Sequence, residues 1–403
     1  MAARIHTPSP DDFPARADLV VIGGGVVGAA TAFYASRAGL DVLVLERRSA
    51  LATLTTTRSL EAFRAQFDDA TDIAMMKESI ETFERFGEIV GLPGYDLSLH
   101  QQGYLFVTRE PDGGAKVAAR VAAQRAAGLD DVEHWTGQEA RRRFPWLSPD
   151  VSAAAFRQRD GWLASHELTY GFARASGMRF FVETEVTGFA TSKGRLEGVV
   201  TSRGDVRTPR AVVAAGPYSG KVAALAGVSL PIRPVRRHRA GIKAHDLIPR
   251  DAPMSISLET GAHFRPEGPG AWFGWSNAFE EPPREPTDHV QANPMFPALA
   301  LDAVSQFAPF WGDVAQTLKS SNVTVEAGLY DLTPDARPII GASGTVQGLF
   351  LNSGYSGHGV MGSAAGARRL ADLIVGRERE DTNPFRLARF DDPGAAASGK
   401  LSL

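Results

Sequence analysis

Two short apolar runs flank a segment of small residues near the start of the chain. Residues 18–22 and 41–45 are rich in β-branched and aliphatic side chains, and the alanine-rich segment 29–35 between them continues to Gly39. Short apolar runs fit buried strands, and a longer small-residue segment that stops at a glycine fits a helix. The pattern predicts a strand–helix–strand unit, the building block of a parallel sheet.

Further apolar runs predict that this sheet is completed from distant parts of the chain. Residues 181–186 and 210–215 read as strands that return to it. Residues 349–351 read as another strand, and the apolar positions of 365–374 predict a helix soon after it. The runs 261–267 and 271–276 are rich in aromatic residues and predict a separate strand pair. With 403 residues, the chain exceeds what one hydrophobic core usually organises, so two domains are expected.

Charge and composition exclude several classes of function. The net charge of -3 argues against a nucleic-acid partner. The densest basic cluster is one short segment, which we interpret as a solvated edge or an interface: Arg233, Arg236, Arg237 and Arg239. No run approaches the roughly 20 apolar residues of a membrane span, and residues 1–16 do not resemble a signal peptide. We expect a cytoplasmic protein, either a monomer or a homo-oligomer.

The chain contains no cysteine. This excludes disulfides, thiol nucleophiles, cysteine metal ligands and a flavin attached through a cysteinyl sulfur. We expect no metal site, and any flavin should be held noncovalently.

A glycine-rich turn joins the first predicted strand to its helix. Gly23 permits the tight turn, Gly25 lets backbone N–H groups approach a pyrophosphate, and Gly28 lets helix and strand pack closely. Glu46 ends the second strand, where a carboxylate can accept hydrogen bonds from a ribose diol. The combination predicts a dinucleotide site. A purely structural glycine turn is the alternative.

A second glycine-rich segment, residues 352–361, precedes the helix near the C-terminus. A second helix N-terminus of this kind suits FAD better than NAD, because reduced flavin gains negative charge at N1 and C2=O that helix N–H groups stabilise. The alternative is a surface loop with a helix cap.

Four motifs follow one another in a fixed order: ADLVVIGGG at 17–25, VVAAG at 212–216, PDARPIIG at 334–341 and GYSGHG at 354–359. Their order resembles the D-amino acid oxidase superfamily, above all its sarcosine oxidase and glycine oxidase branches. The resemblance implies an α/β (α+β) fold, in which a Rossmann-like FAD domain with a parallel sheet is joined to a substrate domain with a mainly antiparallel sheet. The FAD domain should combine residues 16–90, 145–220 and 325–390, and the substrate domain 91–144 and 221–324. Residues 1–15 and 391–403 should be flexible tails.

The resemblance also implies cofactor contacts. Gly328 stands where the sarcosine branch carries its flavin-linked cysteine, which again implies noncovalent FAD. Glu46 would hold the ribose, Val186 would present its backbone to the adenine, and the second glycine segment would line the pyrimidine side of the ring. The expected FAD-binding residues are Gly23, Gly25, Val26, Val27, Gly28, Glu46, Arg47, Thr57, Arg58, Ser59, Val186, Ala215, Gly216, Gly357, His358, Gly359, Val360 and Met361.

Five residues are candidates for contact with the substrate. Arg64 stands where the sarcosine branch binds the substrate carboxylate, with an ion pair to Glu61 as the structural alternative. Tyr330 replaces the carboxylate-binding arginine of the glycine oxidase branch, and Met361 replaces the second cation of the sarcosine branch. Trp272 replaces that branch's oxygen-activating lysine and could instead belong to the sheet core, as His263 could be structural.

The resemblance implies FAD-dependent oxidation of the C–N bond of an amino acid or N-substituted glycine. Hydride would pass from the substrate carbon to flavin N5, the imine would be hydrolysed, and O2 would reoxidise the flavin to give H2O2. Three alternatives remain: a dehydrogenase with another acceptor, a flavin hydroxylase, and a noncatalytic flavin-binding subunit completed by a partner. The GHG at 357–359 disfavours the hydroxylase, which usually has Gly-Asp there.

Overall fold

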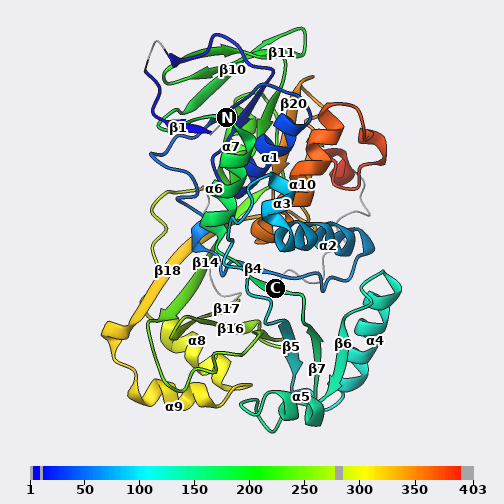
Figure 1. Ribbon diagram of the computed structural model, residues 1–403, viewed down its shortest axis with the longest axis vertical. Helices are drawn as coiled ribbons and strands as arrows, with labels where there is room; N and C mark the ends of the chain where they lie inside the picture. The colour runs from blue at the N-terminus through cyan, green and yellow to red at the C-terminus, as the bar shows by residue number, and fades with distance from the viewer. Residues whose placement is uncertain (1–2, 10–11, 277–284, 392–403) are drawn as a thin grey trace.

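The computed structural model describes residues 3–9, 12–276 and 285–391, and within them the first strand–helix–strand unit forms as predicted (Figure 1). Strands β2 (Leu19–Ile22) and β3 (Val42–Leu45) pair in parallel, and helix α1 (Val26–Arg37) connects them. Gly39 follows the helix with a φ of 93°, a backbone conformation that glycine adopts without strain.

A seven-stranded sheet forms the centre of the nucleotide half. Its first six strands run parallel and its last strand is antiparallel to its neighbour. In spatial order the strands are β1 (Arg4–His6), β9 (Arg179–Phe181), β3, β2, β13 (Ala211–Val213), β20 (Leu349–Ser353) and β19 (Ile339–Ala342). The α/β fold class with a Rossmann-like FAD domain is confirmed.

Both faces of this sheet are covered. Alternate side chains of β2 and β3 point into two different cores, as the period of a strand requires. Helices α1, α6 (Ser165–Ser176) and α10 (Gly359–Ile374) pack on one face, and α7 (Ser219–Ala224) packs on the other. The second face also carries a three-stranded sheet of β10 (Val186–Ser192), β11 (Arg195–Thr201) and β12 (Gly204–Arg207).

The strand predicted over 181–186 is wrong as a single element. The chain ends β9 at Phe181 and begins β10 at Val186, and these strands belong to different sheets. Glu183, with a φ of 51°, breaks the extended conformation between them.

An eight-stranded sheet forms the other half. All neighbouring strands are antiparallel except β15 and β5, which agrees with the expected mainly antiparallel sheet. Its strands, in spatial order, are β18 (Val323–Leu332), β14 (Arg233–Ile242), β17 (Gly270–Trp275), β16 (Ala262–Glu267), β15 (Met254–Ser257), β5 (Tyr104–Thr108), β7 (Ala153–Arg157) and β6 (Glu133–Thr136).

The two faces of this sheet differ in what they contact. Phe264 and Phe273 pack on one face against α8 (Phe296–Ser305) and α9 (Phe310–Thr317). Side chains of the opposite face, among them Tyr104, belong to the core shared with the nucleotide half. The remaining helices are α2 (Ala70–Glu84), α3 (Phe86–Val90), α4 (Gly113–Ala126) and α5 (Gly137–Arg143).

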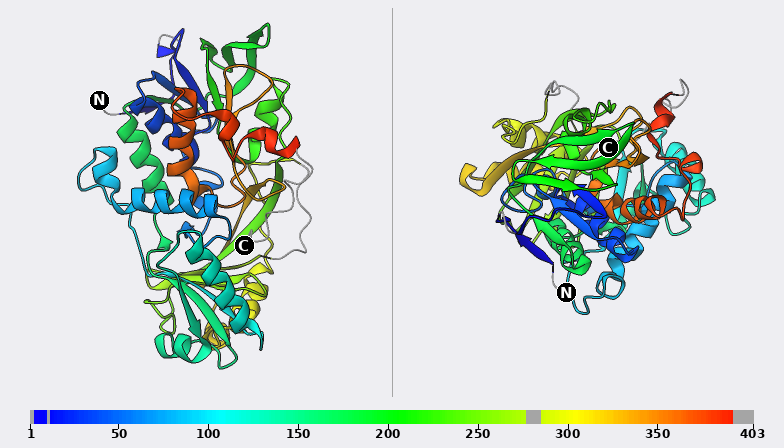
Figure 2. Two further views of the ribbon diagram at one scale, coloured as in Figure 1. Left: turned by 90° about the vertical axis from the view of Figure 1, so that its right-hand side faces the viewer. Right: turned by 90° about the horizontal axis from the view of Figure 1, so that it is seen from above.

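The two halves lie end to end in an elongated molecule, and β14 and β18 extend from one towards the other (Figures 1 and 2). The ranges 145–220 and 325–390, expected in the FAD domain, contain β7 and most of β18, which pair within the eight-stranded sheet instead. Residues 4–6, expected in a flexible tail, form β1 because they pair with β9 at the sheet edge. The rest of the expected tails falls partly outside the described residues, at 1–2, 10–11 and 392–403.

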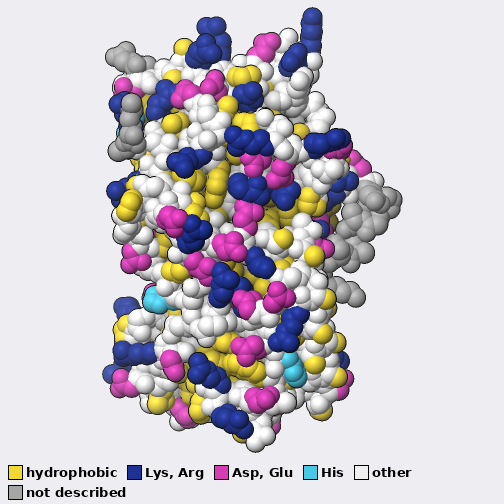
Figure 3. All heavy atoms as spheres, turned by 45° about the vertical axis from the view of Figure 1, so that its right-hand side comes forward, with side chains coloured by type: hydrophobic (Ala, Val, Ile, Leu, Met, Phe, Trp, Pro, Cys, Tyr) yellow, Lys and Arg dark blue, Asp and Glu magenta, His cyan; other side chains and the backbone are white. Residues whose placement is uncertain are grey.

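The surface carries both signs of charge. On the face shown in Figure 3, basic and acidic side chains are interspersed rather than gathered by sign. None of the helices in the described ranges combines the length and the apolar character needed to cross a bilayer.

Candidate active site and cofactor cavity

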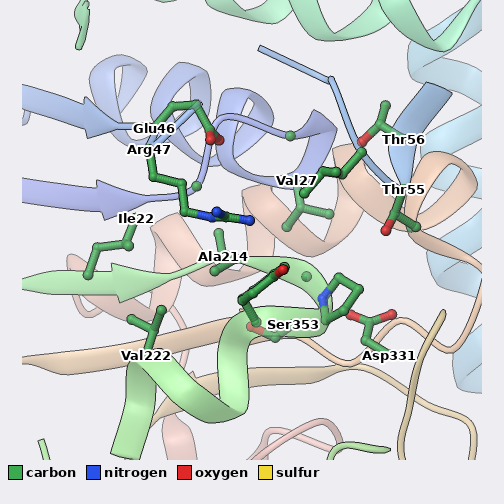
Figure 4. Close-up of a pocket in the computed structure, with 18 of the residues that line it drawn as sticks. Ile22, Val27, Glu46, Arg47, Thr55, Thr56, Ala214, Val222, Asp331 and Ser353 are labelled. Carbon is green, nitrogen blue, oxygen red and sulfur yellow. The ribbon is translucent and has the colours of Figure 1, made fainter. Parts of the chain in front are cut away.

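A cavity of about 580 Å³ lies at the carboxyl ends of β2, β3, β13 and β20, where Ile22, Leu45, Ala214 and Ser353 line it (Figure 4). The carboxyl edge of an open parallel sheet is the usual ligand site in this class of fold. The lining includes these residues predicted to bind FAD: Gly23, Gly25, Val26, Val27, Glu46, Arg47, Ser59, Val186, Ala215, Gly216, Gly357, Gly359 and Val360.

Two chain-distant helices begin at this cavity. Gly25 precedes α1 and His358 precedes α10, and neither residue caps its helix with a side-chain hydrogen bond. Val26 N–H reaches the Thr56 hydroxyl at a long 3.4 Å. Uncapped helix N-termini present N–H groups and positive potential, which suits a pyrophosphate at one and the electron-accepting edge of a flavin at the other.

The glycines of the first turn are required by close contacts. A Cβ atom on Gly28 would lie 1.9 Å from the carbonyl oxygen of Gly23, and one on Gly23 would lie 2.4 Å from that of Ala214. Real Cβ atoms do not approach backbone oxygens so closely, so both positions exclude any side chain. Gly28 therefore acts by packing and does not line the cavity.

Glu46 is held in place by backbone donors. Gly24 N–H donates to Oε2 at 2.7 Å and Arg48 N–H donates to Oε1 at 2.8 Å. Burial raises the pKa of Glu46, while these N–H groups and the neighbouring arginines favour its charged form. The carboxylate keeps free lone pairs towards the cavity, as a ribose-binding residue needs.

The rim near Glu46 is joined to Asp288, a residue that lies shortly before α8 of the other half. Its carboxylate accepts hydrogen bonds from Arg47 Nη1 at 2.8 Å, Arg48 Nη1 at 2.9 Å and the Tyr218 hydroxyl at 2.5 Å. The Arg47 bond is the main reason that the pKa of Asp288 falls to about 2. In Figure 4 the Arg47 side chain extends from the Glu46 side into the open centre of the cavity.

The opposite end of the cavity is formed by Tyr330, Asp331 and the second glycine loop. The Tyr330 ring lies so close to Gly357 that a Cβ there would meet it at 2.3 Å. Asp331 accepts a hydrogen bond from Gly354 N–H at 2.9 Å, and burial raises the pKa of Asp331 to about 6. The loop is thus anchored to β18, so the eight-stranded sheet and the start of α10 face each other at this end of the cavity. We call it the ring end, because the flavin ring is expected there.

Arg64 lies near this end, although it does not line the cavity. It follows the short strand β4 (Ala62–Phe63), which pairs with β8 (Gly161–Trp162), and it is 1% exposed. Its guanidinium lies 4.1 Å from the Phe67 ring centre and donates to the Gln66 carbonyl. The charge of Arg64, after burial, lowers the pKa of His358 to about 3, which places the arginine near the start of α10.

The structural alternative for Arg64, an ion pair with Glu61 one helical turn away, does not form. The segment is a strand rather than a helix, and Glu61 has a φ of 59°. Glu61 accepts a hydrogen bond from Ser165 N–H at 3.1 Å and lies 3.6 Å from Arg265.

The strand pair predicted as a roof forms the hairpin β16–β17. His263 Nδ1–H donates a hydrogen bond to the Gly261 carbonyl at 2.7 Å, and burial lowers the pKa of His263 to about 4, so its imidazole is neutral. The Trp272 ring lies 4.0 Å beneath the Arg239 guanidinium, which pairs with Glu326 at 2.7 Å. The predicted basic segment therefore contributes inward-facing arginines rather than only a solvated edge.

The other predicted residues lie behind the cavity wall. Thr57 donates to the Ala52 carbonyl, and Arg58 donates to that of Ala327 at 3.0 Å. The His358 and Phe67 rings pack in a T-shaped arrangement, and Met361 is packed in the core. Their proposed contacts with FAD or substrate stay predictions.

Several lining residues were missed by the sequence analysis. Thr53, Thr55 and Thr56 line the middle of the cavity, and the run of threonines there was an available signal. Tyr218 and Asp331 also line it. Asp288 carried no sequence signal, because its partners lie far away in the chain.

Comparisons with known proteins agree with this geometry. The family model described as "FAD dependent oxidoreductase" (DAO) matches residues 18–373. A Xenopus laevis protein named FAD-dependent oxidoreductase domain-containing protein 1 is 29% identical over 95% of this chain and 84% of its own. Sarcosine oxidase subunit beta of an Arthrobacter species is 26% identical over 94% of both chains. The crystal structure of L-proline dehydrogenase from P. horikoshii superposes with a TM-score of 0.81 and 26% identity, covering 94% of this chain and 99% of that one.

The family match covers most of the chain, and it confirms the resemblance drawn from the four motifs. The cavity at the sheet edge, with its two uncapped helix starts, suits a dinucleotide whose pyrophosphate and reduced ring both carry negative charge. The chain therefore belongs to the DAO family of FAD-dependent oxidoreductases, and its cofactor is FAD.

Proposed function

We propose that this protein oxidises the C–N bond of an amino acid or N-substituted glycine. The single observation that carries the proposal is the meeting of α10 and the eight-stranded sheet at the ring end, where Tyr330 packs on Gly357. The names of two relatives, a sarcosine oxidase subunit and an L-proline dehydrogenase, point to the same class of substrate.

The chemistry that FAD supplies when bound is acceptance of a hydride from the carbon beside the amine, which leaves the substrate as an imine that water hydrolyses. The protein's part is orientation. Arg64 binds the substrate carboxylate in this proposal, and the neutral side chains of Tyr330 and His263 border the amine without adding charge.

Support for Arg64 comes from the way its segment is fixed. Ala65 N–H donates to Asp160 at 3.0 Å, and the Gln66 amide donates to Asp160 at 3.2 Å and to the Tyr104 carbonyl at 3.0 Å. The two residues that follow Arg64 are thereby fixed, and the guanidinium is itself held by the Gln66 carbonyl and the Phe67 ring. A fixed guanidinium suits bidentate recognition of a carboxylate.

We further propose that FAD is held noncovalently, that O2 reoxidises it to give H2O2, and that the protein acts in the cytoplasm. The relatives include both an oxidase and a dehydrogenase by name, so the acceptor has to be measured.

The test is anaerobic reduction of the purified holoprotein. A panel of primary and secondary amino acids, among them sarcosine and proline, is added, and loss of the yellow flavin absorbance is recorded. Peroxide is measured after air is admitted. Bleaching by at least one amino acid is the expected result, and a stoichiometric yield of peroxide would support O2 as acceptor.

The other outcomes separate the alternatives. Bleaching only by NADPH with an aromatic substrate would establish a hydroxylase and overturn the proposal. A flavin that no compound in the panel reduces would favour a noncatalytic subunit. Bleaching without peroxide would retain amine oxidation but require another electron acceptor.

A further inference from the structure

Arg237 belongs to the basic segment 233–239 and lies next to a residue of the proposed site. The His238 ring stacks on that of Phe296 in α8, with 4.8 Å between the ring centres. Successive residues of a strand face opposite sides, so the preceding residue, Arg237, points to the opposite face of β14. That face carries Tyr330, whose ring centre lies 5.8 Å from the Arg237 guanidinium. Arg237 therefore projects towards the ring end of the FAD cavity.

The partners of Arg237 do not balance its charge. Its only hydrogen bond among the described residues joins Nη1 to the Arg236 carbonyl at 3.2 Å, and no carboxylate in those ranges lies within ion-pair distance. Arg239, two residues along the same face, pairs with Glu326. A half-buried guanidinium with most of its five N–H donors unused favours an anionic ligand.

Arg237 and Arg64 act on different groups around the site. The charge of Arg237 affects Tyr330 and His263, while that of Arg64 affects Tyr104 and His358. Arg64 lies 5.9 Å from the Tyr104 ring centre and Arg237 lies 5.8 Å from that of Tyr330, and the charge of Tyr330 acts on Tyr104. Burial keeps both imidazoles neutral, which leaves two permanent cations.

We propose that Arg237 binds a second anionic group of the substrate, and that the substrate is an amino acid with two carboxylates, such as an N-(carboxyalkyl) amino acid. This inference rests on the proposed function. One carboxylate binds Arg64 and the other binds Arg237, so that the C–N bond to be oxidised lies between the two anchored groups, on the side of Tyr330. Two charges on the ligand neutralise the two guanidinium groups.

The test measures binding of two unreactive ethers to the holoprotein through the change in flavin absorbance. Diglycolate carries two carboxylates and methoxyacetate carries one, and an ether oxygen replaces the amine in both. We expect Arg237→Gln to weaken diglycolate binding about 10- to 100-fold and methoxyacetate binding less than about threefold. Arg64→Gln should weaken both ligands.

Arg236→Gln is the matched control, because the neighbouring residue faces the other side of β14 and should leave both affinities unchanged. Arg237→Lys keeps the charge and should retain part of the preference for diglycolate, which guards against a misfolded variant. FAD content and thermal unfolding are measured for each protein.

Equal weakening of both ligands by Arg237→Gln would overturn the two-carboxylate proposal, as would no change in either. Failure of the proposed function looks different. If no amino acid reduced the flavin while diglycolate still bound in an Arg237-dependent way, oxidation would be refuted and the anion site would stand.

Discussion

The two ends of the FAD cavity differ in which atoms form them: backbone atoms at one end and side chains at the other. At the pyrophosphate end, backbone atoms of the first turn fit so tightly that a methyl group on Gly28 or Gly23 would overlap a carbonyl oxygen. At the ring end, side chains from separate strands meet, among them Tyr330, His263 and Arg237. The first end binds one cofactor and tolerates little change, whereas the second can change its ligand by exchanging side chains without altering the fold.

The largest effect should follow from a substitution in the glycine turn at the pyrophosphate end. In Gly28→Ala the new Cβ would lie 1.9 Å from the Gly23 oxygen, so α1 must move away from β2. We expect the purified variant to contain no FAD, measured as the ratio of flavin to protein absorbance. Gly220→Ala in α7, where no atom lies within 4 Å of the added Cβ, is the control and should stay yellow. Full flavin content in Gly28→Ala would contradict the tight-turn account.

A smaller effect is expected from the ring end. Arg64→Ala removes a charge-assisted contact to the substrate carboxylate, so KM should rise about 10- to 100-fold while FAD remains bound. Steady-state kinetics and flavin absorbance measure the two quantities separately. Unchanged kinetics would remove Arg64 from the substrate site.

The ribose contact proposed for Glu46 should matter less than the turn. Glu46→Gln replaces an acceptor oxygen by an amide that cannot accept from Gly24 N–H and Arg48 N–H together, and we expect about tenfold weaker FAD binding. Titration of the apoprotein with FAD, followed by quenching of flavin fluorescence, gives the dissociation constant. Glu185→Gln removes an exposed carboxylate from the same end of the cavity and should have no such effect.

The smallest effect concerns Asp331, whose pKa is raised to about 6 by burial. Above that pH its negative charge opposes electron uptake at the ring, and below it the carboxyl is neutral. Asp331→Asn should raise the flavin midpoint potential at pH 8 by about 30 mV, the equivalent of about 1.4 kcal/mol for two electrons. At pH 5 the two proteins should have the same potential. A constant difference at both pH values would show that the charge of Asp331 is not the cause.

Local sequence patterns predicted the pyrophosphate end of the cavity well. The glycine spacing and the runs at 18–22 and 41–45 lie within one continuous segment, so short-range periodicity was sufficient to predict β2, α1 and β3. The split of 181–186 escaped prediction because the positive φ of Glu183 is a local choice that residue type does not reveal.

The ring end depends on pairings that no local pattern contains. Arg237 lies opposite Gly328 only because β14 and β18 pair along their full length across a long stretch of sequence. The register of that pair decides which arginines point inward, and the sequence showed only a basic cluster. The same pairing places β18 in the eight-stranded sheet, although the resemblance placed residues 325–390 in the FAD domain.

The hydrogen-bonded cluster at Asp288 has a consequence for how the protein acquires its FAD. Three residues of the nucleotide half, Arg47, Arg48 and Tyr218, converge on one carboxylate that the chain supplies only after most of the eight-stranded sheet has been synthesised. We expect this cluster to restrict exchange of the flavin, because opening the rim there requires the hydrogen bonds of all three side chains to break. Protein produced under riboflavin starvation should therefore load slowly when FAD is added later, whereas protein produced with ample flavin should retain it through dialysis.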